Sequence, residues 1–151
     1  MGSLLPIFNT SSEVGYGAVI ASLPAFFAIR EAVLNAGGGD PVISLAVAVN
    51  VLAGITGSAS GGMSIALQAL GSTYAEMAQA AGISPEILHR VSALASGGFD
   101  SLPHNGAVIT LLAICGLSHR ESYADIGMVS VVIPLLGLVA VLLLHGMFGT
   151  F

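Results

Sequence analysis

The sequence predicts an all-α integral membrane protein, because of its composition and because of the way its apolar runs are interrupted. Of the 151 residues, 55% are hydrophobic and only 7% are charged, whereas soluble domains carry roughly a quarter charged residues. The mean hydropathy is +0.95, so there is too little polar surface to cover a water-soluble globule. The 20 glycines and 6 prolines are too many for a bundle of uninterrupted helices and predict breaks within the apolar segments.

Charge and cysteine content exclude several classes of function. The net charge is −5, with only three basic residues, whereas nucleic-acid binding needs a basic surface. The one cysteine forms no internal disulfide and no cysteine cluster for a metal. We therefore expect no nucleic-acid partner, no cofactor and no metal ion.

The first two apolar segments are a span at about residues 14–29, which contains Pro24, and a longer run at 42–70. As one straight helix the second run would be about 43 Å long, well over the roughly 30 Å of a hydrocarbon core. It is interrupted by the glycine- and serine-rich stretch Gly57–Gly62. The sequence therefore predicts a re-entrant hairpin with a non-helical tip at Gly57–Gly62.

The third segment, residues 85–117, is predicted to be a broken transmembrane helix. Ser84 and Pro85 supply a hydroxyl cap and a proline in the first turn, both typical of a helix start. The stretch Gly97–Gly106 then interrupts the helix with glycines, a proline and polar residues. Two half-helices around an unwound centre are the expected structure.

The fourth segment, residues 126–147, is the clearest spanning helix of the sequence. Ser118 and Glu121 before it have the spacing of a capping box. Tyr123 lies where interfacial aromatic residues are expected. Together the four segments predict a single transmembrane domain over residues 1–151.

The two interruptions form the candidate site. Unwound backbone survives in a bilayer only where protein buries it or water lines it. Broken helices also offer free N–H groups and dipole ends to ions and substrates. We expect the two stretches to lie close together, and the candidate substrate-binding residues are Thr56, Gly57, Ser58, Ser60, Gly61, Ser96, Gly97, Gly98, Ser101 and Asn105.

Proton coupling is assigned to Asp100 and His104, the ionisable residues of these stretches, because ionisable groups inside a membrane are functional candidates by default. Histidine has an unperturbed pKa of about 6.5, which favours His104 as the proton carrier. Asp100 is then its orienting partner, or the proton site itself if it is deeply buried. Glu13 is the next candidate, and Asn50 is either an interhelical hydrogen bond or a site residue.

Other interpretations remain open beside this one. The small residues of the tip also suit close helix packing, and the break also suits an interfacial loop. The chain is then a structural membrane subunit or a truncated fragment without its own transport activity. An intramembrane serine hydrolase with Ser60 and His104 is less favoured, because the tip lacks Gly-x-Ser-x-Gly spacing centred on Ser60; we expect no enzyme.

Four stretches carry a resemblance to a known family: residues 9–15, 50–62, 95–107 and 116–126. They resemble the C-terminal part of GntP-type permeases, the gluconate:proton symporter family of the ion-transporter superfamily. The Ser-Leu-Pro-His-Asn-Gly stretch at 101–106 is the most specific part. The likeness covers nearly the whole chain, but family members are several times longer, and their tip tends to be a bulkier Gly-Ser-Ala-Thr-Val-Ala.

The resemblance implies one repeat of an inverted-repeat transporter in a bacterial inner (plasma) membrane, with several spans. The implied activity is proton-coupled symport of a small organic anion, with gluconate, a hydroxybutyrate or a similar hydroxy or carboxylic acid left open. The implied partners are this acid, protons, membrane lipids, and the N-terminal half of the permease or a second copy. We expect no transport by one repeat alone.

Overall fold

The structure, a computed structural model, describes residues 4–149, without the side chains at positions 5, 6, 9, 10, 13, 14, 17 and 21. The proposed site residue Glu13 therefore lies outside the described side chains. Within the described range every regular element is a helix, which confirms the predicted all-α class for that range. The elements are α1 (Leu4–Ser22), α2 (Ala25–Asn35), α3 (Pro41–Thr56), α4 (Ala59–Ala80), α5 (Pro85–Ser96), α6 (Gly106–Cys115), α7 (His119–Gly127), the π-helical segment η1 (Met128–Val132) and α8 (Ile133–Phe148).

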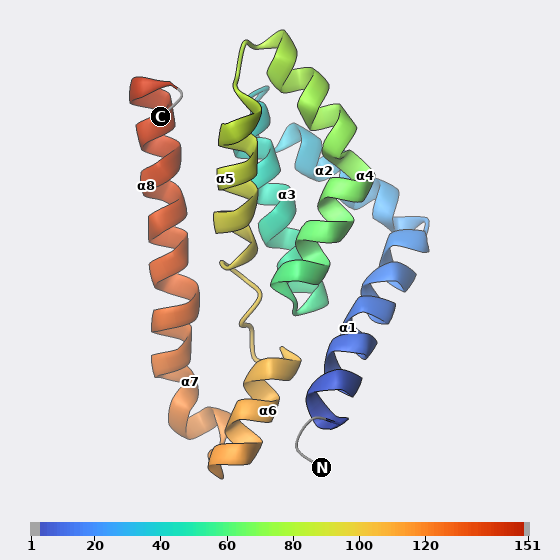
Figure 1. The fold of residues 1–151 in the computed structure, drawn as a ribbon, viewed down its shortest axis with the longest axis vertical. Helices are drawn as coiled ribbons and strands as arrows, with labels where there is room; N and C mark the ends of the chain where they lie inside the picture. The colour runs from blue at the N-terminus through green and yellow to red at the C-terminus, as the bar shows by residue number, and fades with distance from the viewer. Residues whose placement is uncertain (1–3, 150–151) are drawn as a thin grey trace.

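The centre of the fold is a three-helix core of α3, α4 and α5, which all contact one another. In Figure 1, α8 runs beside α5 on one side of this core and α1 runs beside α4 on the other. α6 lies below the core and contacts α1. The most deeply buried core side chains are at most 1% exposed, and they include Val42, Leu45, Val49, Leu52, Leu70, Tyr74, Ile87, Val91 and Ala95.

A buried polar contact ties three helices together inside this core. The Ser44 hydroxyl lies 2.7 Å from the carbonyl oxygen of Val33 and 2.9 Å from the Tyr74 hydroxyl. Ser44 and Tyr74 are both about 1% exposed. Because buried polar groups need partners, this arrangement fixes α2, α3 and α4 relative to one another.

The second apolar run folds as a helical hairpin with a very short tip. α3 ends at Thr56 and is capped by Gly57, which has a φ of +63°, a left-handed conformation that favours glycine. The Ser58 side chain then caps α4 by accepting a hydrogen bond from the Gly61 amide, at 3.2 Å. The predicted non-helical tip Gly57–Gly62 is therefore wrong from residue 59 onward.

Close packing explains why the rest of the tip is helical. A Cβ on Gly62 would overlap the backbone of Ala53, so α4 lies directly against α3 from its first turn. α4 then continues without interruption to Ala80, beyond the predicted end of the hairpin at residue 70. The glycines that suggested a loop are the residues that allow this contact.

The third apolar segment is divided as α5, a connecting stretch at 97–105 and α6. Ser84 caps α5 by accepting from the Glu86 amide at 3.2 Å, which confirms the predicted helix start. Asn105 caps α6 by accepting from Val108 at 2.8 Å. Gly106 is the first residue of α6, one residue earlier than predicted.

The first span differs from its expected course. Residues 14–29 belong to two helices, because α1 ends at Ser22 and α2 begins at Ala25. Pro24 lies between them, and proline lacks the N–H that a continuous helix requires.

α7, η1 and α8 form one continuous helix, His119–Phe148, the one helix among the described residues that is long and apolar enough to cross a membrane. Only 6% of its most apolar window is buried, unlike the core helix of a soluble protein. Pro134 cannot donate to the preceding turn, and the π-helical segment just before it absorbs this defect. The Ser118–Glu121 capping box at its start is present, as predicted. The fold is compatible with a membrane protein.

Candidate functional site

The tip of the hairpin and the stretch at 97–105, here called the break, are joined directly. In Figure 1 they lie at the same level of the molecule. The Asn105 side-chain amide donates to the carbonyl oxygen of Gly57 at 2.6 Å and to that of Asp100 at 2.7 Å. Its oxygen accepts from Val108, so both donors and the acceptor are engaged. Asn105, which is 6% exposed, is the tie that holds tip and break together.

His104 is anchored to the end of α3. Its Nε2 lies 2.9 Å from the carbonyl oxygen of Gly54. A carbonyl can only accept, so Nε2 must carry the hydrogen, and Nδ1 is the nitrogen that can take up or release a proton. The His104 side chain as a whole is exposed.

The left-handed glycine at the tip also makes room for this histidine. A Cβ on Gly57 would lie 3.0 Å from His104 Cδ2 and 3.2 Å from Nε2. A side chain at position 57 is therefore disfavoured for two reasons: the left-handed backbone conformation, and the imidazole ring of His104 close by.

Asp100 does not orient His104, contrary to one of the two expected roles. Its half-buried carboxylate accepts a hydrogen bond from the Ser101 hydroxyl at 3.1 Å. The histidine is oriented by a backbone carbonyl of another helix instead. The break thus holds two separate ionisable groups within four positions of the chain.

The candidate hydroxyls fall into two groups. Thr56 and Ser96 are buried and donate to carbonyls of their own helices, at 2.8 Å and 2.9 Å. Ser58 is 8% exposed and caps α4. Ser60 is exposed, and Ser101 is half-buried with its hydroxyl bonded to Asp100.

Gly98 in the break allows close packing against α3. A Cβ on Gly98 would overlap Asn50 Oδ1, so the break lies directly on α3 here. Asn50 is 5% exposed, and its Nδ2 donates to Ala46 in the same helix at 3.1 Å. Its Oδ1 has no hydrogen-bond partner among the described residues, so the interhelical hydrogen bond considered from the sequence is not formed there. Gly97 and Gly61, the remaining glycine candidates, lie beside Gly98 and Ser60.

α7 holds the break from the opposite side, which the sequence did not suggest. His119 Nε2 lies 2.9 Å from the Pro103 carbonyl oxygen, and the Tyr123 hydroxyl donates to the Ser101 carbonyl oxygen at 3.1 Å. The two rings are neighbours, with centroids 6.1 Å apart. Their spacing of four residues places them on one helix face, but nothing in the sequence indicated their backbone partners.

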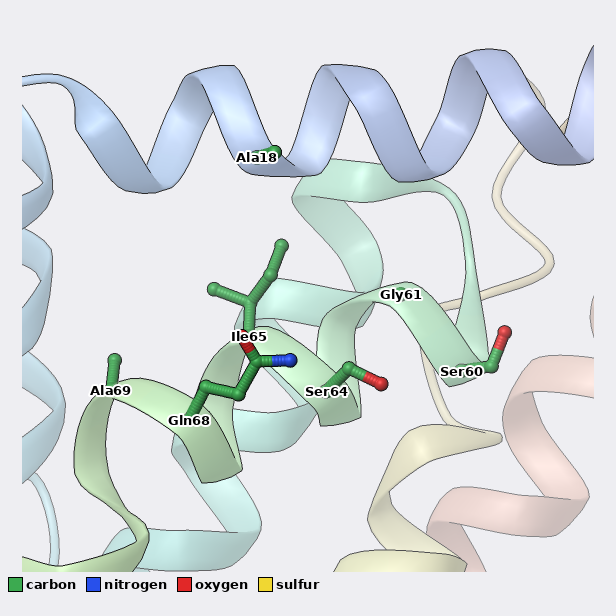
Figure 2. A pocket seen from close by; sticks show the side chains of 7 residues that line it. All are labelled: Ala18, Ser60, Gly61, Ser64, Ile65, Gln68 and Ala69. Carbon is green, nitrogen blue, oxygen red and sulfur yellow. The ribbon is translucent and has the colours of Figure 1, made fainter.

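An open cavity of about 470 Å³ lies between α1 and α4 beside the tip. Figure 2 shows Ser60, Ser64 and Gln68 of α4 along it, with Ala18 of α1 opposite. Small-molecule sites have volumes of roughly 300–1,000 Å³. Ser64 and Gln68 were missed from the sequence, although they follow Ser60 at intervals of four residues.

Two further expectations concern chemistry. The described residues contain no group of three or more His, Cys, Asp and Glu side chains that could hold a metal ion.

The hydrolase alternative requires a hydrogen bond between Ser60 and His104. The structure instead places the Ser60 hydroxyl 3.5 Å from that of Ser58 and engages His104 Nε2 with Gly54.

Comparison with known proteins gives one informative similarity. The chain is 54% identical over 125 residues to a protein of Bacillus subtilis (strain 168) named "Uncharacterized transporter YxjC". This match covers 83% of the chain and 26% of the relative, so the chain spans about a quarter of that protein's length. No protein-family profile matches the chain, and no solved structure matches it.

Proposed function

We propose that this chain is part of a proton-coupled symporter for small organic anions in a bacterial inner membrane. The similarity to a protein named as a transporter supports transport. The long exposed apolar helix supports a membrane location. The substrate class and the coupling to protons rest on the chemistry of the junction between tip and break.

The observation that carries the proposal is which side chains near this junction can bear a positive charge. An anion bound there needs a positive partner, but neither 54–62 nor 96–106 contains a lysine or arginine. His104 supplies that charge when Nδ1 takes up a proton, while Nε2 stays bonded to Gly54. Binding of the anion and binding of the proton then favour each other, because each stabilises the charge of the other. Such mutual dependence is what symport requires.

The hydroxyls around the junction indicate the kind of anion. The exposed Ser60 hydroxyl can donate to and accept from an oxygen-rich solute, whereas the half-buried Ser101 hydroxyl, whose hydrogen goes to Asp100, can accept from a hydroxyl group of the solute. Gluconate, a hydroxybutyrate or a related hydroxy or carboxylic acid suits these partners. The resemblance to GntP-type permeases supports the same class.

The intact protein in membrane vesicles tests this proposal. With an inward proton gradient, labelled gluconate or 3-hydroxybutyrate should accumulate, and a protonophore should abolish the accumulation. A sodium gradient in place of the proton gradient is the matched control and should drive nothing. Accumulation that follows sodium, or no accumulation of any hydroxy or carboxylic acid, contradicts the proposal.

A further inference from the structure

α4 carries a row of exposed polar residues, of which only the first, Ser60, belongs to the candidate site. Every fourth position from the tip onward is polar and exposed: Ser60, Ser64, Gln68, Ser72 and Glu76. Residues four apart are neighbours on a helix surface, so these side chains form a continuous line. The line is about 24 Å long, at 1.5 Å of rise per residue.

The other side of the same helix is fully packed. Ala66, Leu70, Tyr74 and Ala78 are at most 1% exposed and face the core. α4 therefore has two different faces along its length: a buried face that packs against α3 and α5, and an exposed face that carries the polar row. α4 is not polar all round, because the polar row lies on the side of the helix that faces away from the core.

A lipid environment for this row is physically unfavourable. Ser64, Gln68 and Ser72 make no side-chain hydrogen bond within the part of the chain that the structure describes. In hydrocarbon each unsatisfied polar group costs several kcal/mol. The row ends in Glu76, whose carboxylate requires water or headgroups. Water along the row satisfies all of these groups.

The first half of the row already borders a cavity of suitable size. Ser60, Ser64 and Gln68 line the cavity of about 470 Å³ between α1 and α4, as Figure 2 shows. This volume holds roughly 15 water molecules, at about 30 Å³ each. It also suits a small hydroxylated acid, and its lining includes Ser60 and Gly61, directly after the tip.

We infer that this row lines a water-filled path along which the organic acid reaches the tip from the Glu76 end of α4. The inference rests on the proposed function for the identity of the solute. The hydroxyl and amide groups of the row replace the water around the acid's oxygens as it moves. The charge of Glu76 lies at the wet end, where ions screen it within about 8 Å.

Cysteine accessibility tests this path directly. Cys115 is exposed and is the one cysteine of the sequence, so Cys115→Ser provides the background. Ser64→Cys, Gln68→Cys and Ser72→Cys are then labelled in membrane vesicles with a charged methanethiosulfonate. Leu67→Cys is the matched control, because Leu67 is an apolar residue of the same helix and is 42% exposed.

Thiols react as thiolates, which form in water and not in hydrocarbon. We expect the three row positions to react at least about tenfold faster than Leu67→Cys, because the inferred path wets the row and Leu67 is an apolar residue that lies off it. Saturating gluconate or 3-hydroxybutyrate should slow labelling at Ser64→Cys. Equal rates at Ser64→Cys and Leu67→Cys, or row positions that do not react, overturn the path. Fast labelling that neither acid slows overturns its role for the substrate.

The outcomes separate this inference from the proposed function. If uptake is driven by protons but the row positions do not react, the path is wrong and the proposed function still holds. If the row positions react and either acid slows the reaction, but uptake does not depend on the proton gradient, the path holds and the proposed proton coupling is wrong.

Discussion

His104 and Asn105 are neighbours in the chain but have different tasks in the structure. Asn105 uses its whole side-chain amide to join tip, break and α6. His104 uses Nε2 for its bond to Gly54, and the proposed function assigns the coupling proton to its Nδ1. The sequence predicted both as functional residues, but it placed Asn105 among substrate-binding groups, and a fully engaged amide is better suited to positioning the histidine.

A substitution at Gly57 tests whether the tip of the hairpin positions His104. Gly57→Ala should destabilise the protein by about 1–2 kcal/mol, since an L-residue is strained in the left-handed region. It should also displace the His104 ring, which a Cβ would approach to 3.0 Å. Proton-driven uptake should therefore fall and its pH dependence should shift.

Gly116→Ala is the matched control, because Gly116 has a φ of +66° and nothing within 4 Å of an added Cβ. It should lower thermal stability by a similar amount and leave the pH dependence of uptake unchanged. Identical pH profiles for both variants contradict the account of Gly57.

The partners of His104 show why residue-level geometry was not predictable. Its acceptor is a backbone carbonyl 50 positions earlier in the chain. Carbonyls are present at every residue, so the sequence carries no signal for which one is used. Asp100, a nearby carboxylate, was the expected partner and binds Ser101 instead.

At the scale of elements, α4 shows how tertiary packing overrides local preference. Gly61 and Gly62 are poor helix formers and suggested a loop. In the fold they lie in the first turn of α4, where Gly62 allows contact with the backbone of Ala53. The existence of the hairpin followed from the length of the apolar run, but its tip depended on a contact between helices that composition does not reveal.

Gly62→Ala should therefore be strongly destabilising for so small a change. The added methyl overlaps the Ala53 backbone, and overpacking of this kind costs about 1–3 kcal/mol or more. Gly71→Ala is the control on the same helix, because an added Cβ would meet only Leu67 Cβ, at 3.9 Å. It should be neutral or stabilising by up to about 1 kcal/mol, through helix propensity.

Thermal unfolding in detergent measures both variants. A Gly62→Ala protein as stable as Gly71→Ala would show that α3 and α4 do not pack as closely as the structure has them.

At the scale of the whole molecule, the proposed function assigns one side of a substrate site to this chain. Ser60 is exposed and the cavity beside it is open, and the part of the chain that matches the relative covers only 26% of the relative's length. Composition and apolar segments predicted the helical class and the two interruptions. They did not predict that α7 holds the break through His119 and Tyr123, because the acceptors are backbone atoms of a distant segment.

We predict that this chain, reconstituted alone as a monodisperse monomer, does not accumulate organic acid. Co-reconstitution with the N-terminal half of the permease, or antiparallel association of two copies, should restore accumulation, because a repeat-interface site needs both sides. Uptake by the purified monomer would contradict this prediction.

The central claim is that His104 carries the coupling proton, and His104→Gln in the intact transporter tests it most directly. The glutamine amide can still donate to the Gly54 carbonyl in place of Nε2, but it has no nitrogen that binds a proton. Proton-driven accumulation should be abolished, while exchange of labelled for unlabelled acid, which needs no net proton movement, should persist. Ser101→Ala, as a comparison, should raise the KM and keep the dependence on the proton gradient. If His104→Gln leaves accumulation and its pH dependence unchanged, the proton is carried elsewhere and the account is wrong.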